Sequence, residues 1–108
     1  MNFTPPPIEK IRYLLDDPGK GNFFKAFGFT IQDWPTLATA ILNMAVQNQH
    51  ALVFRRTTIY GGEYEITGEL ETPMGRKVNV KSGWWMDPSQ TDTLGFVTAY
   101  PNNQPTKG

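Results

Sequence analysis

Residues 74–87 read Met-Gly-Arg-Lys-Val-Asn-Val-Lys-Ser-Gly-Trp-Trp-Met-Asp, and residues 93–101 read Thr-Leu-Gly-Phe-Val-Thr-Ala-Tyr-Pro. The first run alternates between two faces with a period of two, which is typical of a β-strand with one buried face. The second run mixes β-branched and aromatic residues and stops at Pro101, which cannot donate to a strand ladder. Residues 87–92 between them have the composition of a turn. The two runs therefore predict a β-hairpin with an aromatic wall.

Two further strands are predicted before this hairpin, at residues 52–58 and 63–70, with Gly61-Gly62 as the turn between them. Placing Ile66 opposite Val80 keeps the apolar side chains of the two neighbouring strands on one face. The same register sets Glu65 opposite Lys81 on the other face, where the two charges attract each other. The second half of the chain thus predicts a four-stranded antiparallel meander.

The first half of the chain predicts helices. Apolar residues recur at helical spacing from residue 8 to 15 and again from residue 34 to 49, and a short helix is expected at 21–27. Two to three N-terminal helices packed on one face of the four-stranded antiparallel sheet make an α+β fold. We expect a single domain over residues 1–108, with an ordered core at about 8–101 and frayed ends at 1–6 and 102–108.

The charge composition restricts the partners. Ten basic and ten acidic residues cancel, and the pI is about 6.6. A broad nucleic-acid surface is usually basic, so no DNA partner is expected, although a small local basic site is compatible with this composition. Cysteine is absent and there is one histidine, so we expect no disulfide, metal or cofactor. The sequence shows no signal peptide or transmembrane segment, so a cytoplasmic protein without a membrane partner is expected.

Three stretches carry a resemblance to a known family. Residues 13–29 contain Tyr-Leu-Leu, Gly-Lys, Phe-Phe and Gly-Phe; residues 62–76 contain Gly-Glu-Tyr and Thr-Pro-Met-Gly-Arg; and residues 80–101 contain Val-Lys-Ser-Gly-Trp and Val-Thr-Ala-Tyr-Pro. Together they resemble a family of small uncharacterised bacterial domains that occur alone or at the C-termini of polymorphic toxins. That family is similar to the barnase–EndoU–colicin–RelE-like group, whose members are mostly metal-independent ribonucleases.

The resemblance implies a metal-independent ribonuclease-like toxin domain that acts on RNA and that a cognate immunity or antitoxin protein binds. It also implies which residues carry the chemistry. The chain has Gly21 and Asn22 after Lys20, where the family more often has a small residue and a basic one. The matching positions implied as catalytic are Lys20, Lys81, Ser82, Thr98 and Tyr100, and the matching tryptophan is Trp84.

Metal-independent RNA cleavage requires a base, an acid and fixed positive charge at the phosphate. Lys20 and Lys81 would supply the charge, Tyr100 or His50 would carry a proton, and Ser82 and Thr98 would donate hydrogen bonds to phosphate. Arg55 and Arg56 are further candidates for binding phosphate. The site requires Ser82, Thr98 and Tyr100 on one face of adjacent strands, and parity permits it, because residues 82 and 84 share a face of one strand and residues 96, 98 and 100 share a face of the next. This is also the core face, so the site would lie at the open end of the core.

Each of these residues also has a structural explanation. Lys81 would pair with Glu65, Ser82 and Thr98 would be buried hydroxyl groups bonded to backbone, and Trp84 and Tyr100 would line the core. His50 follows the long helix and would interact with its dipole, and the arginines would pair with carboxylates of residues 63–71. The alternative function is therefore a non-catalytic binding or accessory domain, and a third is an immunity-type partner, although such proteins tend to be strongly acidic. The position of Lys20 relative to Lys81 and Tyr100 discriminates between the first two.

Overall fold

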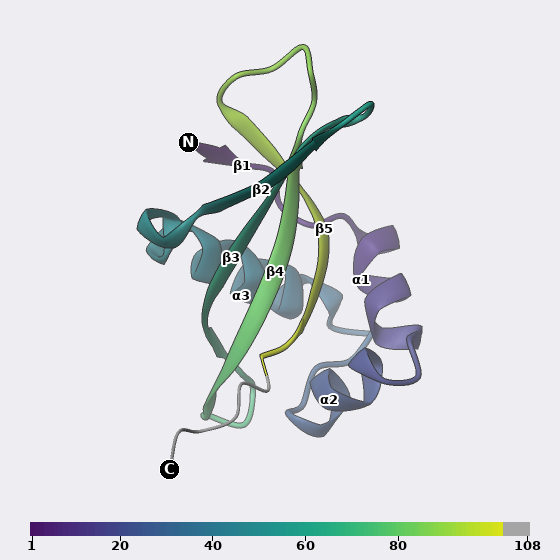
Figure 1. Ribbon diagram of the computed structural model, residues 1–108. Coiled ribbons are helices and arrows are strands. Elements are labelled where there is room, and N and C mark those ends of the chain that lie inside the picture. Colours follow the sequence, from purple (N-terminus) through teal and green to yellow (C-terminus); the bar gives the residue numbers. More distant parts are fainter. Residues whose placement is uncertain (103–108) are drawn as a thin grey trace.

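The computed structural model describes residues 1–102, in which three helices precede most of a strongly twisted β-sheet (Figure 1). In chain order the elements are β1 (Asn2–Phe3), α1 (Ile8–Asp16), α2 (Lys20–Ala26), α3 (Trp34–Gln47), the 3-10 helix η1 (Gln49–Ala51), β2 (Val53–Thr58), β3 (Gly61–Glu71), β4 (Lys77–Met86) and β5 (Thr93–Pro101).

The sheet has five strands in the order β1-β5-β4-β3-β2. Strands β2 to β5 form the predicted antiparallel meander, and β1 adds a fifth strand that runs parallel to β5. The α+β class and the three helices are confirmed, and the four-stranded, purely antiparallel sheet is wrong. Strand β1 has only two residues, which is too short for an alternating pattern, and it pairs with residues 91 positions away in the chain. The sequence pattern therefore does not reveal it.

The N-terminal residues are part of this sheet, although residues 1–6 were expected to be frayed. Asn2 pairs with Thr93 and Phe3 with Leu94. The ring of Phe3 packs edge-on against Trp84, with 5.1 Å between the ring centroids. At the other end, Asn102 donates its backbone N–H to Asn79, and residues 103–108 of the predicted frayed tail lie outside the described residues.

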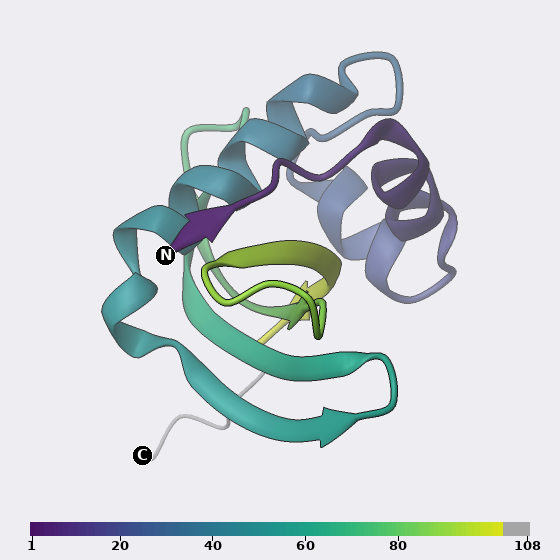
Figure 2. The ribbon, with the colours of Figure 1, turned by 90° about the horizontal axis from the view of Figure 1, so that it is seen from above.

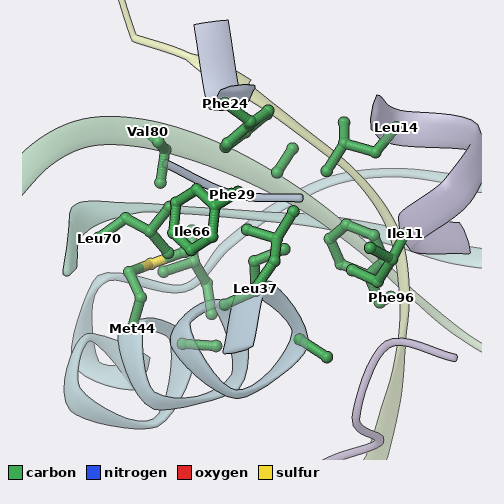
Figure 3. Packing of buried hydrophobic residues seen from close by; sticks show 14 of the residues in the cluster. Ile11, Leu14, Phe24, Phe29, Leu37, Met44, Ile66, Leu70, Val80 and Phe96 are labelled. Carbon is green, nitrogen blue, oxygen red and sulfur yellow. The ribbon is translucent and has the colours of Figure 1, made fainter. Parts of the chain in front are cut away.

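The hydrophobic core lies between the helices and one face of the sheet. Helix α3 crosses that face behind β3 and β4, and α1 and α2 lie beside β5 (Figures 1 and 2). Each fully buried large side chain contributes roughly 1.5–3 kcal/mol relative to an exposed one. The residues that meet in the core include Ile11, Leu14, Phe24, Phe29, Leu37, Met44, Ile66, Leu70, Val80 and Phe96 (Figure 3).

The register between β3 and β4 differs from the predicted one by two residues. Ile66 pairs with Ser82, not with Val80, and Glu65 pairs with Gly83. A shift of two residues leaves every side chain on its predicted face, so the hydrophobic pattern cannot detect it. The turn between β2 and β3 is also displaced, because Ile59 and Tyr60 form it and Gly61 already belongs to β3.

Candidate active site

Strand β5 changes the orientation of its side chains at Val97. Phe96 pairs with Trp84, whereas Thr98 pairs with Gly83, so Val97 is an extra residue that forms a β-bulge. Before the bulge, Phe96 points into the core; after it, Thr98 and Tyr100 point to the opposite, outer face of the sheet. The common face predicted for Ser82, Thr98 and Tyr100 is therefore wrong.

A second bulge lies in the edge strand β2. Phe54 pairs with Tyr64 and Arg56 pairs with Glu63, which leaves Arg55 as the extra residue. In a regular strand, adjacent residues such as Arg55 and Arg56 would point to opposite faces. Because of the bulge, both arginines line the outer face.

The outer face is thus organised as rows of side chains that run across the strands. The register aligns three such rows, each perpendicular to the strand direction. The first row, nearest the β2–β3 hairpin, contains Arg56, Glu63, Trp85 and Gly95, from β2, β3, β4 and β5 in that order. The second row contains Glu65, Gly83 and Thr98, and the third contains Thr67, Lys81 and Tyr100, each from β3, β4 and β5.

Helix α2 brings Lys20 to these rows. The Asp17 carboxylate accepts the backbone N–H groups of Lys20 at 2.8 Å and Gly19 at 2.9 Å, which fixes the start of the helix and lowers the pKa of Asp17. Gly21 lies so close to α1 that a Cβ atom there would be 2.0 Å from the carbonyl oxygen of Leu15, so only glycine fits. This close approach explains why glycine follows Lys20.

The Lys20 ammonium group reaches β5. Its Nζ donates a hydrogen bond of 3.2 Å to Oγ1 of Thr98 and lies 5.8 Å from the ring centroid of Tyr100. A cation at this distance from an aromatic face is attracted to it. Two predicted site residues, Thr98 and Tyr100, are therefore in contact with a third, Lys20, from a distant part of the chain.

Glu65 joins the remaining lysine to this group. The Tyr100 hydroxyl donates to Oε2 of Glu65 at 3.3 Å, and Nζ of Lys81 lies 3.9 Å from Oε1 of the same carboxylate. Partial burial raises the pKa of Tyr100, and the negative charge of Glu65 and its hydrogen bond raise it further, against the opposing effect of Arg55. The phenol of Tyr100 therefore keeps its proton to a higher pH than an ordinary tyrosine and is available as a donor.

Glu65, Thr98 and Tyr100 line an open cleft of about 980 Å³ on the outer face, and Lys20 and Lys81 adjoin it through their contacts with these residues. Lys10 of α1 and Tyr60 at the tip of the β2–β3 hairpin line it, and these two elements lie on the same side of the molecule (Figures 1 and 2). Its charged lining consists of Lys10, Arg55, Arg56, Glu63 and Glu65, and a smaller hollow of about 320 Å³ continues past Thr98 to Lys20 and Asp17. Around the cleft and this hollow, Lys10, Lys20, Arg55, Arg56 and Lys81 face the carboxylates of Glu9, Asp17, Glu63 and Glu65, which leaves an excess of one positive charge.

Three predicted site residues lie away from this cluster. Ser82 is fully buried, donates to the carbonyl oxygen of Ile66 at 2.9 Å and accepts the indole N–H of Trp84 at 2.8 Å. These contacts match the structural explanation for Ser82, a buried hydroxyl bonded to backbone. Trp84 borders the cleft, but it is only 1% exposed and packs in the core, and His50 is exposed in η1 without lining the cleft.

Sequence reasoning missed Glu65, Trp85 and Tyr60 as site residues. Glu65 was placed on the correct face but interpreted only as the partner of Lys81. Trp85 adjoins the predicted Trp84, and alternation alone places it on the outer face, so that signal was present. Tyr60 had no comparable signal, because it was expected next to a turn at Gly61-Gly62.

Among residues 1–102, no group of three or more histidines or carboxylates is arranged to hold a metal ion. None of the helices in that same region is long and apolar enough to cross a membrane. The side chains of the candidate site belong to lysine, arginine, tyrosine, threonine and glutamate, which can act as acids, bases and anion ligands.

Comparison with known proteins gives one family. No curated protein and no solved structure matches the chain. A family model described as a domain of unknown function, DUF6883, matches residues 13–103, a range that contains Lys20, Glu65, Lys81, Thr98 and Tyr100. Because this match covers most of the chain, the protein belongs to the DUF6883 family of domains of unknown function.

Proposed function

We propose that this protein is a metal-independent ribonuclease and that the cluster of Lys20, Glu65, Lys81, Thr98 and Tyr100 is its active site. The observation that supports the proposal most strongly is that Lys20 from α2 meets Thr98 and Tyr100 on β5. Lys20 lies 5.8 Å from the ring centroid of Tyr100, and Lys81 lies 3.9 Å from Glu65, the hydrogen-bond acceptor of Tyr100; this proximity supports the enzyme over the binding module.

The reaction requires a proton to leave the 2′-hydroxyl group and another to reach the 5′-oxygen. In the proposed mechanism the Glu65 carboxylate accepts the 2′ proton as O2′ attacks phosphorus, and the Tyr100 hydroxyl protonates O5′ as the P–O5′ bond breaks. The products are a 2′,3′-cyclic phosphate and a free 5′-hydroxyl. The hydrogen bond between Tyr100 and Glu65 then returns the proton from the carboxyl group to the phenolate, so that both groups regain their starting state.

The negative charge that develops on the phosphorane oxygens needs fixed positive partners. Lys20 and Lys81 would act as these partners, with Arg55 at the same cleft and Thr98 as a neutral donor. No step in this scheme requires a bound cofactor. Ser82 and His50 have no role in it, because Ser82 is buried on the other face and His50 does not line the cleft.

The biological setting is proposed from the family resemblance alone. A small bacterial domain of this kind would act on cellular RNA in the cytoplasm as a toxin, and a cognate immunity or antitoxin protein would block it. An inhibitor that covers the cleft would contact the exposed cations of β2, among which Arg56 has a 72% exposed side chain.

The proposal is tested by incubating the purified protein with total RNA, tRNA and ribosomes in EDTA and identifying the ends of any fragments. Cleavage that yields 2′,3′-cyclic phosphates, and that stops when the substrate carries 2′-O-methyl groups, is the expected result. If the folded protein leaves all three RNA samples intact, the ribonuclease proposal is wrong.

One observation favours a non-catalytic binding domain as the second candidate. Arg56 and Lys81 are each paired with a carboxylate, at 2.8 Å from Glu63 and 3.9 Å from Glu65. Such pairing reduces the positive charge available to a phosphate. A folded protein that binds RNA or a protein partner through the cleft without cleaving RNA would establish this function.

A further inference from the structure

Two consecutive tryptophans of β4 have different environments. Trp84 is buried in the core, whereas Trp85 is half-buried on the outer face and lines the cleft. Its register partners are Glu63 on β3 and Gly95 on β5. Trp85 is therefore an aromatic side chain that no step of the proposed reaction uses, although it lies in the same cleft.

Two glycines allow the Trp85 indole to lie against the sheet. A Cβ atom at Gly95 would be 3.5 Å from Nε1 of Trp85. One at Gly61 would be 3.0 Å from Cε3, although it would first meet the carbonyl oxygen of Met86 at 2.0 Å. The indole thus lies next to both glycines. Covering glycines in this way is a known structural use of an aromatic residue, so contact with the sheet alone does not indicate a ligand.

The path from Trp85 to the proposed active site is open. Gly83 lies between Trp85 and Lys81 on the outer face of β4 and has no side chain to block the cleft. At roughly 3.3 Å per residue, Trp85 and Lys81 are about 13 Å apart along the strand. A ligand that extends along β4 can therefore contact both the aromatic ring and the cationic cluster.

The walls around Trp85 are aromatic and charged. Tyr60 is 70% exposed at the tip of the β2–β3 hairpin and lines the same cleft. The Arg56–Glu63 pair occupies the same row as Trp85. An aromatic platform next to a cationic groove is the combination with which proteins bind single-stranded nucleic acid, since every base presents a face for stacking.

We propose that Trp85 is a base-stacking subsite, which holds an unpaired nucleobase of RNA while a neighbouring phosphate lies against Lys20, Arg55 and Lys81. This inference rests on the proposed ribonuclease function and narrows its substrate class to single-stranded RNA. Bases in a duplex are stacked and paired with each other, so they cannot reach Trp85 without being unstacked.

The test measures binding, not cleavage, so that its result is independent of catalysis. The probe is a fluorescent single-stranded oligoribonucleotide in which every 2′-hydroxyl group is methylated, and its dissociation constant is measured by fluorescence anisotropy. Trp85→Leu should weaken binding roughly 5- to 100-fold, whereas Trp85→Phe, which keeps an aromatic face, should lose much less. An abasic probe of the same length should bind weakly to all three proteins, and so should a duplex.

Gly83→Val provides a second variant if Trp85→Leu does not fold. A Cβ atom at Gly83 would be 3.4 Å from Cγ2 of Thr98, so a side chain can be accommodated there. The valine side chain would fill the path between the ring and the cations and would also crowd Glu65 and Thr98 in the same row, so the ratio of the affinities for the intact and abasic probes is compared, and this ratio should fall in the variant.

The outcomes separate the two proposals. Binding that depends on Trp85 in a protein that cleaves no RNA supports the subsite and overturns the ribonuclease. Cleavage by the wild type together with unchanged probe affinity in Trp85→Leu overturns the subsite and leaves the ribonuclease standing. Equal affinity for the intact and abasic probes also overturns the subsite.

Discussion

The hydroxyl group of Tyr100 on β5 donates a 3.3 Å hydrogen bond to Oε2 of Glu65 on β3, across the intervening strand β4. Gly83 pairs with Glu65 and has no side chain, so nothing on β4 separates the two groups at that row. The pair connects a proton donor to a proton acceptor inside a cationic cleft, and the proposed chemistry depends on it.

Replacing Glu65 should change the ionisation of Tyr100. In Glu65→Gln the carboxylate charge is removed, so the pKa of Tyr100 should fall toward its ordinary value of 10.0. Because the pKa of Tyr100 is higher in the folded state than in the unfolded chain, the free energy of unfolding falls as the pH rises above the unfolded-state pKa. This fall should be smaller in Glu65→Gln. The measurement is a ¹³C NMR titration of the tyrosine Cζ signals, with Glu69→Gln as the control because Glu69 is exposed beyond the cluster. An unchanged Tyr100 pKa in Glu65→Gln would contradict the pairing.

Ser82→Ala should destabilise the fold and leave the active site intact. The substitution removes the acceptor of the Trp84 indole N–H and the donor to the Ile66 carbonyl, both in a fully buried place. Leaving buried polar groups unpaired typically costs about 1–3 kcal/mol. Urea denaturation should show this loss, and Ser89→Ala, which removes an exposed hydroxyl bonded only to Asp87, should show a smaller one. If Ser82→Ala were as stable as the wild type but inactive, Ser82 would have to act in catalysis.

The three-dimensional arrangement of the sheet was predictable only in part from the sequence. Alternation in residues 77–86 correctly separates the two faces of β4, and helical spacing correctly predicts α1 and α3. The bulges at Arg55 and Val97 add one residue each without any compositional signal, and they reverse the predicted orientation of the residues around them.

The prediction of the register and of the site was limited for the same reason, because hydrophobic alternation assigns residues to a face and gives no further information. The β3–β4 register depends on the loop 72–76, where Thr72 donates its N–H and its hydroxyl to the carbonyl of Arg76, and hydrophobic alternation does not report on this loop. Lys20 was identified only through the family resemblance, because its contact with Thr98 joins positions 78 residues apart. Glu65 was identified as a charge partner and not as a base, since alternation assigns a face and not a chemical role.

Asp17→Asn should weaken the start of α2 in a pH-dependent manner. Hydrogen bonds from the N–H groups of Lys20 and Gly19 lower the pKa of Asp17 below its ordinary value of 3.8. A carboxyl group whose pKa is lowered on folding stabilises the folded state at pH values above its unfolded-state pKa. This stabilisation is lost as the pH falls through its folded-state pKa. The difference in unfolding free energy between the wild type and Asp17→Asn should therefore shrink as the pH falls below about 5. Urea denaturation at a series of pH values measures it, and a difference that stays constant with pH would show that the carboxylate charge is irrelevant.

The most direct test of the central claim compares two lysine substitutions in α2. Lys20 contacts Thr98 and Tyr100, whereas Lys25 is exposed in the last turn of the same helix and lines neither the cleft nor the adjoining hollow that contains Lys20. RNA cleavage by Lys20→Met and Lys25→Met is measured in EDTA beside the wild type, after circular dichroism has shown that all three are folded. We predict that Lys20→Met lowers kcat/KM roughly 10²–10³-fold, as expected when a transition-state charge partner is removed, and that Lys25→Met retains wild-type activity. Cleavage that is equal in all three proteins would contradict the assignment of the active site to this cleft.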